Sequence, residues 1–222
     1  MSIIRQKYDS WREKKRQDGL KEKKSVLKDL SDKKKIIIFS NDCVGGRLMK
    51  DYYLPQYTPM VNIWYSAADF LKICREPEKY LSLKLSDVRL DENGIPSARL
   101  GDTILHFNHD NNLDAVVRKW EKGCRAFFKA VNSERHEICV VMNDRNGFDE
   151  NMVEKFEYLP YTHKILFTHK KYASGCTFYM KGDEYKEFVE IMTNFEGWFT
   201  LKRRYDRFDF YQWFYDMYSA ED

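Results

Sequence analysis

Four residues able to do chemistry follow one another directly after an apolar run at 36–39: Ser40, Asn41, Asp42 and Cys43. A short helix is expected just beyond them, over residues 47–53. Free backbone N–H groups and the dipole at a helix N-terminus stabilise anions and lower the pKa of a thiol. Cys43 could therefore be a nucleophile for acyl transfer, or Asn41 and backbone N–H groups could polarise a carbonyl or phosphate. In the plainer interpretation, one of the first three residues caps the helix and Cys43 packs inside.

A general base for such a nucleophile is available at two places in the chain. His109 follows a predicted strand at 102–107, in which Asp102 and His106 share one face. His169 ends another apolar run, at 164–168. Either His109 or His169 could pair with Cys43.

Asp144 and Arg145 follow a third apolar run, at 137–142. An Arg in this position suits a phosphate or carboxylate through bidentate contacts. The alternative is an Asp turn with an exposed Arg. No spacing of His, Cys and carboxylates is diagnostic of a metal, so we predict none, and the cofactor stays unknown. Asn41, Asp42, Cys43 and His109 are the catalytic candidates, and Ser40, Asp102, Asp144, Arg145 and His169 are the candidates for substrate binding.

The elements that must position these residues form an α/β pattern. The three apolar runs each stop at a polar loop, and in a mainly parallel sheet those loops share the carboxyl edge, where ligands bind. A fourth strand is predicted at 177–181, helices at 66–75, from Asp110 or Asn111 onwards and at 183–195, and a β-hairpin at 83–107. We expect a three-layer α/β/α fold with a mixed, mainly parallel sheet.

The two ends of the chain differ from the middle. Residues 1–35 contain 13 Lys and Arg against 6 Asp and Glu, a net charge of +7, whereas the remainder carries −4. This basic helical arm precedes a single α/β domain at 36–222. It could be a solvated helix docked on the body, a peripheral contact with an anionic membrane, or a nucleic-acid contact. An aromatic C-terminal helix has a core stripe at Phe210, Trp213, Phe214 and Met217, with Tyr211, Tyr215 and Tyr218 elsewhere on it.

Composition excludes several classes of protein. The chain of 222 residues is 43% hydrophobic, too apolar for disorder. It has no run long enough to cross a bilayer and no secretory signal, so we expect a cytoplasmic protein. The five cysteines form no CxxC pair. The body is net acidic, so no nucleic-acid partner is predicted. Walker, dinucleotide, GxSxG, HExxH and kinase motifs are missing.

Ordered blocks of residues within 36–182 resemble a bacterial family. They are residues 40–46, Thr58-Pro59 with Asn62, Ile95-Pro96, residues 100–102, residues 107–109, Trp120, residues 144–147, Phe156, residues 159–161, Lys164, and residues 167–169. This order is similar to that of domain-of-unknown-function family 1919, whose members are often labelled exopolysaccharide biosynthesis proteins. Asp42 and Asp110 stand where the family pattern has Asn and Tyr. The resemblance implies an α/β/α fold and a place in surface-polysaccharide assembly, but no reaction.

These observations together favour a transferase acting on a glycan precursor at the inner face of the membrane. Acyl transfer from an activated donor comes first, because of Cys43 and the nearby histidines. Glycosyl or phospho-group transfer comes second, with Arg145 and the helix N-terminus holding a phosphate. The alternative is a non-catalytic carbohydrate-binding or scaffold protein of the same pathway, using the aromatic C-terminal helix.

Overall fold

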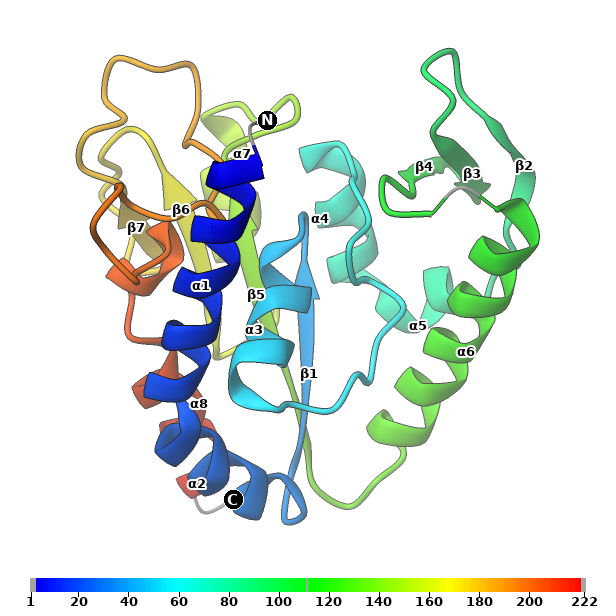
Figure 1. Cartoon of the computed structure of the whole chain (residues 1–222). Helices are drawn as coiled ribbons and strands as arrows, with labels where there is room; N and C mark the ends of the chain where they lie inside the picture. Colours follow the sequence, from blue (N-terminus) through cyan, green and yellow to red (C-terminus); the bar gives the residue numbers. More distant parts are fainter. Residues whose placement is uncertain (1–2, 111, 221–222) are drawn as a thin grey trace.

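A parallel sheet of four strands forms the centre of the protein (Figure 1). The computed structural model describes residues 3–110 and 112–220, with side chains from residue 5. In order across the sheet, the strands are β1 (Lys35–Ser40), β5 (His136–Asn143), β6 (Lys164–Thr168) and β7 (Thr177–Tyr179). β1, β5 and β6 are the three apolar runs of the sequence, and they are buried as such runs predict. Their carboxyl ends therefore meet at one edge, as predicted.

Helices cover both faces of this sheet. Ile36 and Ile38 pack on one side against α2 (Lys21–Ser31), α3 (Val44–Tyr52) and α8 (Phe210–Ser219). Ile37 and Phe39 point to the other side, towards α4 (Ala67–Arg75), α6 (Leu113–Val131) and α7 (Asn151–Glu157). Successive side chains of β1 point to opposite faces of the sheet and therefore pack into two separate hydrophobic cores. The prediction of an α/β fold is confirmed.

The antiparallel strands form a second sheet of their own and do not extend the parallel one. Its strands are β2 (Ser86–Leu90), β3 (Pro96–Leu100) and β4 (Thr103–His106). Gly101, with a φ of +61°, turns the chain between β3 and β4. The segment predicted as a hairpin at 83–107 therefore forms three strands instead of two. The apolar side of this sheet, with Ala98, Leu100 and Leu105, packs into the same core as α6 and the short helix α5 (Pro77–Leu81), away from the edges of the parallel sheet.

Side-chain caps mark where α4 and α6 begin. Ser66 accepts a hydrogen bond from the backbone N–H of Asp69, so α4 begins where the sequence predicts. Asn112 does the same for α6, while Asn111, one of the two predicted start residues, lies outside the described residues.

The segment predicted as a helix at 183–195 is irregular instead. Val189 and Met192 are buried at a helical spacing, which explains the prediction. However, two buried carboxylates bind the backbone N–H groups that a helix would use. Val189 N–H donates to Asp144 and Glu190 N–H donates to Asp183. Tertiary hydrogen bonds here replace local ones.

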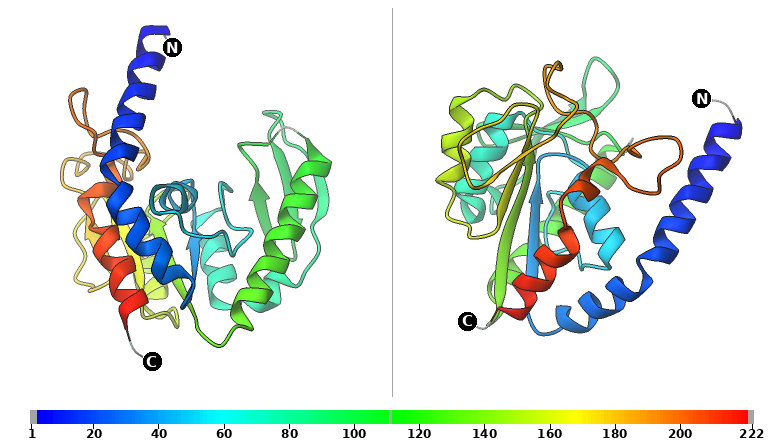
Figure 2. Two further views of the ribbon diagram at one scale, coloured as in Figure 1. Left: turned by 60° about the horizontal axis from the view of Figure 1, so that its bottom comes forward. Right: turned by 90° about the vertical axis from the view of Figure 1, so that its left-hand side faces the viewer.

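The N-terminal arm consists of α1 (Ile3–Gly19) and α2, and α1 stands off from the body at its free end (Figure 2). α1 contacts the body through arginines: Arg16 forms ion pairs with Asp51 and Asp206, with N–O distances of 2.6 and 2.7 Å. The face of α1 that contacts the body is therefore polar, unlike the apolar face of an ordinary amphipathic helix. Part of the positive charge of α1 is therefore neutralised by ion pairs with the body of the protein.

The C-terminal helix α8 follows a 3₁₀ turn at Arg204–Arg207. Of its predicted core stripe, Phe210, Phe214 and Met217 are buried, and Trp213 is half-buried against the same core. Within the described residues, no helix is both long and apolar enough to span a bilayer.

Candidate functional site

The turn from β1 into α3 is held by its own polar side chains. The Asn41 side chain is fully buried and clamps the end of β5. Its Nδ2 donates to the Asn143 carbonyl (3.0 Å), and its Oδ1 accepts from the Asn143 N–H (3.1 Å). Both ends of the amide are thus engaged with the backbone. Ser40 is buried beneath the turn.

Asp42 does not cap α3 as the plainer interpretation predicted: the N-cap residue is Cys43, which forms no side-chain cap, and Asp42 instead holds the turn just before the helix. One carboxylate oxygen accepts from the backbone N–H of Val44 (2.8 Å) and from the Ser40 hydroxyl (3.3 Å). The other accepts from Nδ2 of Asn143 (2.6 Å). Burial raises the pKa of this carboxyl, against the hydrogen bonds from Val44 and Asn143, which lower it.

Cys43 is the reactive group that the turn presents. Its Sγ lies 3.0 Å from Nε2 of His109, a residue 66 positions away in sequence. Burial raises the pKa of the Cys43 thiol to about 11, and the charge of Asp42 adds to the effect. The Cys43 side chain is therefore mainly a thiol, not a thiolate, at neutral pH. Of the two histidines that the sequence left open, the structure brings His109 to Cys43.

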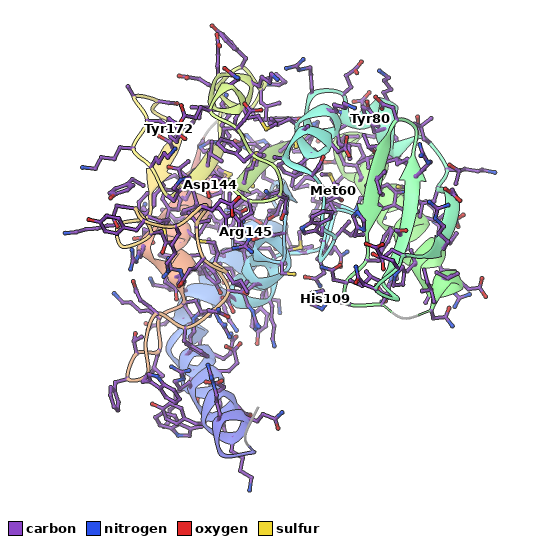
Figure 3. All side chains as sticks on the ribbon, turned by 90° about the horizontal axis from the view of Figure 1, so that it is seen from above. Met60, Tyr80, His109, Asp144, Arg145 and Tyr172 are labelled. Carbon is purple, nitrogen blue, oxygen red and sulfur yellow. The ribbon has the colours of Figure 1, made fainter. Side chains whose placement is uncertain are left out.

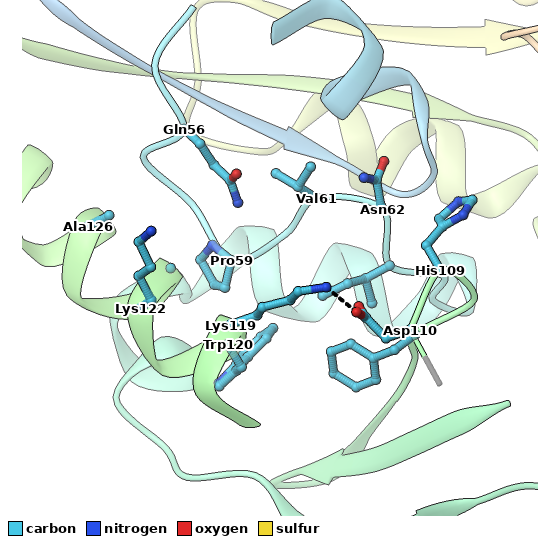
Figure 4. A pocket seen from close by; sticks show the side chains of 13 residues that line it. Gln56, Pro59, Val61, Asn62, His109, Asp110, Lys119, Trp120, Lys122 and Ala126 are labelled. Atoms are coloured by element: carbon cyan, nitrogen blue, oxygen red, sulfur yellow. Dashed lines mark hydrogen bonds and ion pairs between the residues drawn. The ribbon is translucent and has the colours of Figure 1, made fainter. Parts of the chain in front are cut away.

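His109 also lines a cavity of about 460 Å³ (Figure 4). The cavity lies between α6 and the irregular segment 56–63. The two walls approach closely, because a Cβ on Gly123 of α6 would lie 2.4 Å from the Cα of Pro59. Its lining residues are Gln56, Pro59, Val61, Asn62, Ile63, Phe107, His109, Asp110, Lys119, Trp120, Lys122, Gly123 and Ala126.

The cavity is amphipathic and rich in hydrogen-bond donors. Lys119 and Lys122 contribute positive charge, although Lys119 is paired with Asp110. The indole Nε1–H of Trp120 is buried and has no acceptor among the described residues. A buried donor without a partner is costly, so a ligand oxygen that accepts from it would gain free energy.

One wall is joined to the Cys43 turn through Asn62. This residue has a left-handed φ of +57°. A Cβ on Gly46 of α3 would lie 2.6 Å from its Oδ1, so only glycine leaves room for this contact. The cavity wall and the Cys43 turn are therefore packed as one unit.

The other predicted residues lie in different surroundings. Asp144 is buried under the carboxyl edge, where its Oδ2 accepts from the backbone N–H (2.6 Å) and Nδ1 (2.5 Å) of His169. Arg145 donates to the Val189 carbonyl (2.8 Å) and stacks over Phe188. These contacts fasten the 183–195 segment to the sheet. Figure 3 looks down on this edge and shows Asp144 and Arg145 over the parallel sheet, with His109 beside the antiparallel one.

Asp102 does not come to the site. It occupies the exposed turn between β3 and β4, where it pairs with Lys72 (3.0 Å) and accepts from the Tyr80 hydroxyl (2.8 Å). Those contacts lower its pKa. Strand alternation placed Asp102 on the face of His106, but Gly101 turns the chain there.

Sequence reasoning overlooked Asn143, Gln56 and Lys119, which have no motif around them. Trp120 and Asn62 were noticed only as parts of a family pattern. Within the part of the chain that the structure describes, no group of three or more His, Cys, Asp or Glu side chains lies together as a metal site would need.

Comparison with known proteins places this site in a family. Residues 13–215 match the family model described as "Domain of unknown function (DUF1919)". The chain belongs to this family. The DUF1919 match takes in Cys43, His109 and the cavity, and extends beyond the predicted 36–182 into α1 and α8. A relative named "Uncharacterized protein", from Haemophilus influenzae (strain Rd), is 32% identical over 178 residues, covering 80% of this chain and 82% of the relative.

Proposed function

We propose that this DUF1919 protein is a thiol-dependent acyltransferase that acts on a glycan precursor. The observation that carries the proposal is the 3.0 Å separation of the Cys43 sulfur and His109 Nε2 beside a donor-rich cavity. A nucleophile within hydrogen-bond reach of a base is the arrangement that covalent acyl transfer requires.

The reaction runs in two balanced steps. His109 Nε2 takes the thiol proton as the Cys43 sulfur attacks the carbonyl of an acyl thioester donor. The carbon–sulfur bond of the donor breaks, and its leaving thiolate takes the proton from His109. An acceptor hydroxyl then attacks the acyl-Cys43 thioester and gives its proton to His109, which returns it to the sulfur. The ester product leaves with Cys43 regenerated.

The start of α3 can stabilise the oxyanion formed in each step. Backbone N–H groups in the first turn of a helix have no intrahelical acceptor. Gly45 and Gly46 belong to that turn, two and three residues after Cys43 in the chain. The raised pKa of Cys43 makes His109 necessary, because almost no thiolate exists before the proton is removed.

The cavity supports a sugar as the acceptor. It combines the Trp120 ring and the Phe107 side chain with the amides of Gln56 and Asn62 and with Lys122. Sugars are bound by such mixtures of apolar surface and a few placed polar groups. The label that family members often carry, exopolysaccharide biosynthesis, is the reason for choosing a surface-polysaccharide precursor among sugars.

Intact-mass spectrometry tests the proposal. The purified protein is incubated with short-chain acyl-CoA donors, and we expect the mass of one acyl group on Cys43. Cys43→Ser should abolish the thioester, and His109→Ala should slow its formation by about 10²–10⁴-fold. Cys176→Ser is the matched control, since Cys176 is also free and partly exposed. Absence of acyl-Cys43 with every donor would overturn the acyltransferase proposal.

Lys119, Lys122 and the unpartnered Trp120 N–H favour a second candidate, glycosyl or phospho-group transfer with the phosphate of a sugar nucleotide in the cavity. A rise in melting temperature with a sugar nucleotide, lost in Lys122→Ala, would support it over acyl transfer. The non-catalytic alternative would use aromatic side chains on the outer face of α8 to bind a glycan. Tyr218 is buried, so α8 offers Tyr211 and Tyr215 for such a contact and only a small aromatic surface.

A further inference from the structure

A ridge of exposed aromatic side chains runs from α1 onto the loop 194–203. The loop is closed by the pairing of Phe195 with Arg203 and by a hydrogen bond from Glu196 N–H to the Lys202 carbonyl. Its tip exposes Trp198 (60%) and Phe199 (99%). On α1, Trp11 is 50% exposed. Tyr8 joins the two parts, since its ring stacks on both Trp11 (5.8 Å) and Trp198 (6.5 Å).

This aromatic ridge is held in place by buried arginines. Arg12 donates to the carbonyls of Gly197 (2.5 Å) and Trp198 (3.3 Å), and its guanidinium lies 4.0 Å from the centre of the Phe195 ring. Arg203 lies over the same ring at 4.3 Å. The apolar side chains at the loop tip are therefore held exposed to solvent by hydrogen bonds and cation–π contacts at the base of the loop.

A cationic cavity of about 450 Å³ adjoins the ridge. It is lined by Arg5, Asp9, Arg12, Glu13, Arg47, Lys50, Asn194, Phe195 and Arg203, five cations against two carboxylates. The side chains of Arg12 and Arg203 are more than nine-tenths buried and pair with Asp9 and Glu13, but their Nε–H groups have no acceptor among the described residues. A phosphate oxygen is the acceptor that such groups fit best.

We propose that the aromatic ridge and the cationic cavity together dock the protein on an anionic phospholipid surface. Trp and Phe side chains at the tip enter the interfacial region, while a lipid phosphate enters the cationic cavity and the outer lysines of α1 face the headgroups. Charge complementarity selects this occupant, because residues 1–35 carry +7 while the rest of the chain carries −4. The 194–203 loop supplies the apolar surface that α1 by itself lacks.

Vesicle flotation of the full chain tests the docking surface. We expect the protein to float with vesicles of phosphatidylcholine containing phosphatidylglycerol, and to stay behind with phosphatidylcholine alone. The double variant Trp198→Ala, Phe199→Ala should lower the partition coefficient at least about tenfold. Its matched control is Tyr158→Ala with Tyr185→Ala, two aromatics at least as exposed elsewhere. Acylation of Cys43 in solution should be unchanged in both double variants.

The charge is tested separately with Lys50→Gln, since Lys50 is an exposed residue of the cationic cavity. Its loss should weaken binding to anionic vesicles about fivefold, and Lys129→Gln on α6 should not. Failure to float with anionic vesicles, equal binding to neutral ones, or binding unaffected by the Trp198 and Phe199 changes would each overturn the proposal. Uptake by nucleic acid or self-association in place of flotation would do so as well.

Discussion

The ionisation of Cys43 is open to a direct chemical test. Burial, and then the charge of Asp42, raise the pKa of its thiol to about 11. The thiolate fraction at pH 7 is then about 10⁻⁴, against about 3% for a free thiol of pKa near 8.5. Alkylation by iodoacetamide should accordingly be about 300-fold slower than that of a free thiol.

The assay follows carbamidomethylation of the Cys43 peptide by mass spectrometry between pH 6 and 10. Peptide-level detection separates Cys43 from Cys176, while Cys74 and Cys139 are fully buried. The rate should rise about tenfold for each pH unit, with no plateau below about pH 10. Asp42→Asn should raise the rate at pH 7 because it removes the charge that disfavours the thiolate. Asp29→Asn, at an exposed carboxylate of α2, is the control.

A plateau beginning below pH 7 would refute this reasoning. It would mean that Cys43 and His109 already form a thiolate–imidazolium pair. His109 would then have no proton to remove during attack, and the first step proposed for acyl transfer would be wrong even though the two residues are close.

Three further substitutions test the framework around the site. Asn41→Ala should lower the free energy of unfolding by about 2–4 kcal/mol in urea denaturation, because it leaves the N–H and carbonyl of Asn143 unpaired in the core; an unchanged midpoint would remove the clamp role. Gly123→Ala should cost about 1–3 kcal/mol by forcing α6 away from Pro59, whereas Gly19→Ala, with open space around it, should cost nothing measurable by the same assay. Glu13→Gln should lower the melting temperature at pH 7. Burial disfavours the ionised form of Glu13, but Arg203, Arg47 and Arg16 outweigh burial and hold the pKa of Glu13 below the ordinary value of 4.5. The contribution of Glu13 to stability is therefore complete above about pH 4.5 and disappears as the pH falls through the lowered pKa. A difference that persisted at pH 2 would contradict the ion-pair explanation.

Local patterns were sufficient for the sheet and most of its helices. Ile36 to Phe39 is a β-branched and aromatic run too short for a buried helix, and each similar run ends in polar residues. Parallel strands must place those ends at one edge, so the carboxyl-edge site could be located without a structure. Ser66 and the stripe at Phe210, Phe214 and Met217 marked α4 and α8 for the same reason, since caps and helical faces are short-range features.

Contacts between distant segments decided the rest. The 183–195 segment has helical spacing, but Asp144 and Asp183 bind its N–H groups, and neither bond is visible in a local window. Whether the thiol of Cys43 meets His109 or His169 depends on how the β4–α6 connection packs against the β1–α3 turn. That packing depends on the close approach of Gly46 to Asn62 and of Gly123 to Pro59.

The sequence by itself determined which residues could react and at which edge of the sheet Cys43 lies, because strand and helix periodicity act over a few residues. Only the tertiary structure decided that Asn41 is a buried clamp, that Asp42 binds Val44 and Asn143 in the turn before α3, and that Cys43 and His109 form the pair. Burial and hydrogen-bond partners are properties of the folded whole, and they assign each polar side chain to holding the site together or to facing a ligand.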